Sequence, residues 1–182
     1  MKELRAPLLA LLLVLTPACT QAQTQTGSVV VGAAVAQTGQ LADLAAGFRE
    51  ALLLWQGEIN PAGGLLGRHV ELMLIDDHSE AVTAERLYER LVREQRADLL
   101  IGPFGSAASR GAAAAAERAH RVLINATGAT QSVLRAGHRY VFQVAAPYAA
   151  YGTGVLAIAR RAGYHRLLIL ALEQYALAQP RT

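Results

Sequence analysis

Ser106 stands where a chain of this pattern would bind a small anion. Residues 98–101 read as a short apolar strand, and the Gly/Pro turn 102–105 separates this strand from a helix that begins at or beside Ser106. The first N–H groups of a helix lack acceptors within the helix, and the helix dipole adds positive charge there. A carboxylate or phosphate could therefore bind here, with the Ser106 hydroxyl as a further donor. Serine is also a common N-cap, so a purely capping role for Ser106 stays open.

Two other polar segments follow apolar runs in the same way. Residues 125–130, Asn-Ala-Thr-Gly-Ala-Thr, follow the run 121–124, and the pair Asp76-Asp77 follows the run 70–75. Adjacent carboxylates can hold a metal ion or transfer protons, but one of them can equally cap the next helix. We favour the structural interpretation for the aspartates.

The residue spacing argues against an enzyme. A serine hydrolase needs a G-x-S-x-G elbow, and Phe104 and Ala108 occupy the glycine positions around Ser106. The chain has no G-x-x-x-x-G-K phosphate loop and no set of cysteines for zinc. We therefore expect no catalytic residue, no metal and no cofactor. The histidines are scattered and are expected at the surface: His69, His78, His120, His138 and His165.

Strand and helix patterns alternate along the chain and position these polar segments. The expected strands are 28–35, 70–75, 98–101, 121–124 and 140–144. Helices are expected over 43–59, where apolar residues recur every three or four positions, and after Ser79, with Val82, Leu87, Leu91 and Val92 facing inward. This alternation predicts an α/β fold, a doubly wound parallel sheet that binds ligands at the carboxyl ends of its strands. The segments expected around that crevice are Gln37 to Gln40, Asp76, 102–106 and 125–130.

The N-terminus indicates export. Residues 1–22 combine an early positive charge, a run of leucines and small residues, which is typical of a signal peptide, and 23–27 read as a polar tether. Cys19 follows Ala18 as in a bacterial lipobox, so lipid attachment at Cys19 is an alternative to simple cleavage after Ala22. The chain has 17 basic and 14 acidic side chains, and without residues 1–22 it has 15 basic and 13 acidic ones. Because the two charges nearly balance, we expect no nucleic-acid partner.

Three segments together resemble a known receptor family. Residues 58–67 (Glu-Ile-Asn-Pro-Ala-Gly-Gly-Leu-Leu-Gly), 74–77 (Leu-Ile-Asp-Asp) and 101–106 (Ile-Gly-Pro-Phe-Gly-Ser) occur in the order and spacing of leucine-binding-protein-like receptors. These are the type I periplasmic binding proteins of branched-chain amino acid ABC transporters. The resemblance implies two α/β lobes that close on a small amino acid or related amide, deliver it to a membrane permease and perform no chemistry. It also implies a periplasmic or extracytoplasmic location.

The resemblance assigns ligand contacts by position. The first lobe would fix the ligand's carboxylate and ammonium through Ser106 with the adjacent Gly105, and through the loop after the fourth strand. In that loop Thr127 is the best candidate, with Ala129 or Thr130 depending on a one-residue shift in the match. Tyr175 matches a loop tyrosine of the second lobe that often touches the ligand.

The same resemblance divides the chain into two lobes. Residues 28–146 correspond to the first ligand-binding lobe, and 147–182 to the start of a second lobe whose remainder is absent from this sequence. The second lobe would begin with a helix from Pro147 and a strand at 166–172. Leu44 and Ala45 replace an aromatic residue of the family, so leucine itself is not carried over as the ligand. A ligand-sensing extracellular domain of the same fold is the main alternative, and a secreted α/β hydrolase is a more distant one.

Overall fold

The sheet has five parallel strands in the order β2-β1-β3-β4-β5. The computed structural model describes residues 27–129, 133, 137–166 and 168. The strands are β1 (Val29–Val35), β2 (Val70–Asp76), β3 (Leu99–Ile101), β4 (Val122–Asn125) and β5 (Val141–Gln143). Every neighbouring pair is parallel, which confirms the predicted doubly wound sheet.

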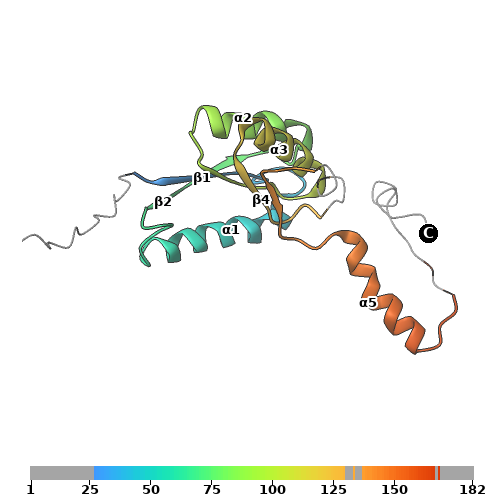
Figure 1. Cartoon of the computed structure of the whole chain (residues 1–182). Helices are drawn as coiled ribbons and strands as arrows, with labels where there is room; N and C mark the ends of the chain where they lie inside the picture. Colours follow the sequence, from blue (N-terminus) through green and yellow to red (C-terminus); the bar gives the residue numbers. More distant parts are fainter. Residues whose placement is uncertain (1–26, 130–132, 134–136, 167, 169–182) are drawn as a thin grey trace, which may run out of the picture.

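Helices cover both faces of this sheet (Figure 1). Helix α1 (Ala42–Ile59) lies on one face, while α2 (Ala84–Arg93) and α3 (Ser106–Ala119) lie together on the other. A short 3-10 turn, η1 (Ala81–Thr83), precedes α2. Helix α5 (Tyr148–Arg161) follows β5 and extends away from the sheet. In the part of the chain that the structure describes, no helix is both long and apolar enough to cross a bilayer.

The α2/α3 face holds the larger core. Tyr88 and Leu91 of α2 are fully buried together with Leu100 of β3 and Leu123 of β4. Helix α3 contributes four alanines that are at most 1% exposed, Ala112, Ala113, Ala115 and Ala116. Because alanine has so small a side chain, α3 can lie close to both α2 and the sheet.

One inward position of the sequence prediction was wrong. Val82 is 92% exposed, whereas Leu91 is fully buried and Leu87 and Val92 pack against the core. The reason is that Val82 lies in η1, before α2 begins at Ala84. A 3-10 turn has three residues per turn, so its residues do not follow the 3.6-residue periodicity of the helix after it.

The helix expected after the fifth strand begins as predicted. Pro147 is the N-cap of α5, with extended backbone angles of φ −62° and ψ 145°. Several apolar side chains of α5, among them Tyr151, Val155 and Ile158, are more than half exposed. Most of the predicted strand 166–172 lies outside the described residues.

Tyr88 joins β1 to β3 where the two strands part. Their ladder ends with Ala33 opposite Ile101. One step further, the Tyr88 hydroxyl accepts a hydrogen bond from the Ala34 N–H at 3.3 Å and donates one to the Ile101 carbonyl at 2.5 Å. Burial raises the pKa of this phenol, so the hydroxyl keeps the proton that it donates. A side chain from α2 thus continues the ladder at the switch in strand order.

We predict that Tyr88→Phe destabilises the protein by about 1–3 kcal/mol, because it removes the partner of the buried Ala34 N–H and of the partly buried Ile101 carbonyl. Urea denaturation followed by circular dichroism measures this loss. The matched control is Tyr164→Phe, which removes a hydroxyl from a side chain on a residue that is 67% exposed and should change the unfolding free energy little. Equal effects of the two substitutions would contradict the assigned role of Tyr88.

Candidate functional site

The turn after β3 presents the N-terminus of α3 at the carboxyl edge of the sheet. Gly105 is the N-cap and has φ +94°, a backbone conformation that favours glycine. Ser106 is therefore the first residue of α3 and not its N-cap. The Ser109 N–H donates to the Gly105 carbonyl at 3.3 Å, so the N–H groups of residues 106–108 precede the helical hydrogen bonds. The helix thus begins at Ser106, one of the two positions that the sequence predicted for this residue, and anion binding there stays a prediction.

Thr127 links this turn to the loop after β4. Its hydroxyl accepts a hydrogen bond from the Gly105 N–H at 3.2 Å and donates one to the Pro103 carbonyl at 2.7 Å. The single hydroxyl hydrogen is thereby used, while one lone pair remains. In this arrangement Thr127 can accept a hydrogen bond from an ammonium group but cannot donate one to a carboxylate.

A buried asparagine organises the loop after β4. Asn125 is fully buried, and its amide nitrogen donates to the Gly128 carbonyl at 2.8 Å and to Oε1 of Gln143 at 2.7 Å. The hydroxyl of Ser109, also fully buried, lies 3.1 Å from Oδ1 of Asn125. Sequence reasoning included Asn125 only as part of the loop and missed Ser109 and Gln143. The available signal was that Asn125 and Gln143 are polar residues that end otherwise apolar strands.

Asp76 holds the loop after β1. Its Oδ1 accepts hydrogen bonds from the N–H groups of Gln37 at 2.9 Å, Thr38 at 3.3 Å and His78 at 2.9 Å. Its Oδ2 accepts one from the Thr38 hydroxyl at 2.8 Å. Burial alone would raise the pKa of Asp76, but these hydrogen bonds outweigh it and lower the pKa to about 2.

Asp77 has a different local role. It is buried, its Oδ1 accepts the Ser79 N–H at 2.9 Å, and burial raises the pKa of its carboxyl. Glu80, and not an aspartate, is the N-cap of η1. Both aspartates brace loops, and neither caps the next helix, so the capping role considered for one of them was wrong.

His78 completes the brace around Asp76. Its side chain is 67% exposed, in line with the surface position that the sequence predicted. Nδ1 lies 2.7 Å from the Thr38 hydroxyl oxygen and 3.1 Å from Oδ2 of Asp76. Because the Thr38 hydroxyl donates to Asp76, Nδ1 must carry the hydrogen that points into this cluster.

The structure brings three of the predicted ligand residues together. Gly105 and Thr127 are hydrogen-bonded, and Ser106 follows Gly105 at the start of α3. Ala129 lies in the same loop as Thr127 and is 2% exposed. Thr130 and Tyr175 lie outside the described residues.

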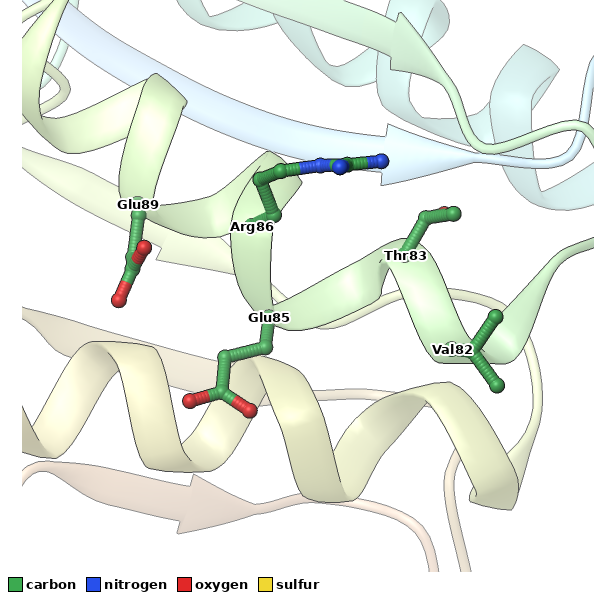
Figure 2. Close-up of a pocket in the computed structure, with 5 residues that line it drawn as sticks. All are labelled: Val82, Thr83, Glu85, Arg86 and Glu89. Atoms are coloured by element: carbon green, nitrogen blue, oxygen red, sulfur yellow. The ribbon is translucent and has the colours of Figure 1, made fainter.

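A surface hollow lies away from these residues. It lies beside the start of α2 and has a volume of about 490 Å³. Figure 2 labels the residues that line it, Val82, Thr83, Glu85, Arg86 and Glu89. Arg118 of α3 pairs with Glu85 at 2.5 Å and with Glu89 at 2.8 Å, and all three side chains are partly in solvent. None of the predicted ligand residues lines it, so we place the candidate site at the strand ends. Within the described residues, no cluster of three or more histidine, cysteine, aspartate or glutamate side chains could hold a metal ion.

The fold is an α/β lobe with a helix N-terminus and polar loops at the carboxyl ends of a doubly wound sheet, the edge at which sheets of this kind bind ligands. The chain belongs to the periplasmic binding protein family, whose model matches residues 28–180. This confirms the family that the sequence resembled.

Solved structures show the same lobe. The chain is similar to the branched-chain amino acid transporter substrate binding protein LivJ from Streptococcus pneumoniae str. Canada MDR_19A, which was solved in complex with isoleucine. The TM-score is 0.64 and the sequence identity 25%, and the match covers 72% of this chain and 39% of LivJ. It is also similar to a putative branched-chain amino acid ABC transporter from Silicibacter pomeroyi, with a TM-score of 0.66 and 26% identity over 75% of this chain and 36% of that one. A solute binding protein from R. palustris, solved with benzoate, shares the fold, with a TM-score of 0.67 and 24% identity over 75% of this chain and 38% of that one. The chain thus spans less than two fifths of each of these proteins.

We predict that Asp76→Asn removes an acid-dependent part of the stability. The folded-state pKa of about 2 lies below the ordinary value of 3.8, so ionised Asp76 stabilises the fold above about pH 4, and this contribution is lost as the pH falls toward 2. At pH 7 the variant should lose about 2 kcal/mol, as expected for hydrogen bonds to a charged group.

Urea denaturation of both proteins between pH 7 and pH 2 checks this prediction. The difference between wild type and variant should shrink on acidification. Asp98→Asn is the control, because Asp98 accepts one backbone N–H, that of Val30 at 3.0 Å. A difference that stays constant down to pH 2 would show that the charge of Asp76 contributes nothing.

Proposed function

We propose that this chain is the ligand-binding part of an ABC transporter substrate-binding component, and that it binds a small amino acid of the branched-chain type or a related amide. The observation that carries the proposal is the N-terminus of α3, which Thr127 holds at the carboxyl edge of the sheet next to the switch in strand order. Membership of the periplasmic binding protein family supports it.

The lobe would recognise the two charged groups of an amino acid separately. The ligand carboxylate would meet the N–H groups at the start of α3 and the Ser106 hydroxyl, where the helix dipole favours negative charge. The ammonium would donate to the remaining lone pair of Thr127. Ala129 or Thr130 would add a main-chain or hydroxyl contact, and Tyr175 would contact the ligand from the second lobe.

The proposal includes a location and a partner. Residues 1–22 would act as a signal peptide and 23–27 as a tether, which places the mature protein in the periplasm or another extracytoplasmic space. Cys19 would be the point of attachment if the protein is lipidated. Residues 28–146 would form the first lobe and 147–182 would begin the second, and a membrane permease would receive the ligand.

We predict that Ser106→Ala weakens isoleucine binding by about 1–3 kcal/mol, as for loss of a hydrogen bond to a charged group. Isothermal titration calorimetry on the purified protein measures this change. Ser28→Ala, which removes a hydroxyl just before β1 at the opposite edge of the sheet, is the matched control and should leave the affinity unchanged.

A second ligand separates the carboxylate contact from the rest. L-isoleucinamide keeps the ammonium and the side chain but lacks the carboxylate, so it should bind wild type more weakly, and its affinity should respond little to Ser106→Ala. If the substitution weakens both ligands equally, Ser106 does not contact the carboxylate. If wild type binds no branched-chain amino acid or amide, the proposed function is wrong.

A further inference from the structure

The Gly128 carbonyl is held by two side-chain amides. Nδ2 of Asn125 donates to this oxygen at 2.8 Å and Nε2 of Gln143 donates to it at 2.7 Å. Asn125 is fully buried, and the two amides also bond to each other. Each of the four amide hydrogens has an acceptor, since Gln143 also donates to the Ala145 carbonyl at 3.0 Å.

This clamp fixes the direction of the next N–H group. The described residues contain no cis peptide bond, so the N–H of Ala129 points opposite to the Gly128 carbonyl. The carbonyl points toward the two amides, and the Ala129 N–H therefore points away from them. Asn125 and Gln143 thus set the orientation of the peptide group that joins Gly128 to Ala129.

Close packing leaves this peptide little freedom. A Cβ atom at Gly128 would lie 2.0 Å from the Ser109 hydroxyl oxygen, and one at Gly102 would lie 2.7 Å from Oδ1 of Asn125. Ser109 belongs to α3 and Gly102 to the turn before it. The clamp is therefore packed directly against the segment that presents Ser106.

Gln143 connects this clamp to the segment that leaves the sheet. Residues 144–147 lead from β5 to α5, and the Ala145 carbonyl in this segment accepts a hydrogen bond from the same Nε2 that holds Gly128. The Val144 N–H donates to the Asn125 carbonyl at 3.1 Å. A movement of the segment that leads to α5 would therefore act on the loop that carries Thr127 and Ala129.

We propose that Gln143, together with Asn125, is a positioning residue that aims the Ala129 N–H at the ligand carboxylate and ties this loop to the segment leading to α5. The inference rests on the proposed function for the identity of the ligand. Its geometric part, the orientation of one peptide group, concerns the free protein as well.

The test compares two glutamines that each donate a hydrogen bond to a backbone carbonyl, one beside the proposed site and one at the opposite edge of the sheet. Gln143→Met keeps the side-chain volume and removes the donors to Gly128 and Ala145. Gln56→Met removes a similar bond, from Nε2 of Gln56 to the Val70 carbonyl at 3.1 Å, at the opposite edge of the sheet. Both variants should lower the melting temperature, but only Gln143→Met should raise the Kd for isoleucine, by about tenfold, which corresponds to about 1.4 kcal/mol.

A second readout needs no ligand. In the free protein, the ¹³C′ resonance of Gly128 and the amide resonance of Ala129 should shift in Gln143→Met and stay in place in Gln56→Met. If wild type binds no isoleucine, the proposed function fails, and the Gly128 and Ala129 resonances alone decide whether Gln143 positions the loop. Unchanged resonances in Gln143→Met, or equal changes of affinity in both variants, would overturn the inference.

Discussion

The structure depends on how backbone N–H and C=O groups find hydrogen-bond partners at the point where β1 and β3 stop pairing. A doubly wound sheet opens at its switch in strand order, and that opening creates a crevice but also ends a hydrogen-bond ladder inside the protein. Here the Tyr88 hydroxyl accepts a hydrogen bond from the Ala34 N–H and donates one to the Ile101 carbonyl, so both of these backbone groups have a partner where the ladder ends. Burial keeps this phenol protonated, which makes the bridge insensitive to pH over the range in which proteins work.

The loops around the crevice follow the same rule. Each is held by a polar side chain from a neighbouring element: Asp76 of β2 holds the loop after β1, Thr127 holds the turn after β3, and Gln143 of β5 helps to hold the loop after β4. Backbone N–H and C=O groups in loops at strand ends have few backbone hydrogen-bond partners, and these side chains provide the missing donors and acceptors. The loops at this edge of the sheet are therefore held in place by side chains from the strands and loops beside them, next to the start of α3.

The fold could be predicted from the sequence because its signals are local. Apolar runs marked all five strands, and the glycine–proline turn before Ser106 marked the start of α3. The prediction failed at Val82 because a 3-10 turn replaced the first helical turn, a choice that apolar spacing does not reveal. Asn125 and Gln143 were missed as partners because their contact depends on the pairing of β4 with β5, which brings together residues 18 positions apart.

The alanine-rich surface of α3 has a consequence for how binding specificity can change. A Cβ at Gly111 of α3 would lie 2.9 Å from the Glu85 backbone nitrogen, and the buried alanines of α3 leave no slack toward the sheet. A helix packed this closely can neither slide nor accept larger residues, so its N-terminus is preorganised and little ordering entropy would be lost if an anion bound there. Any change of ligand preference would therefore come from the loops around the N-terminus of α3, while the position of that N-terminus would stay the same.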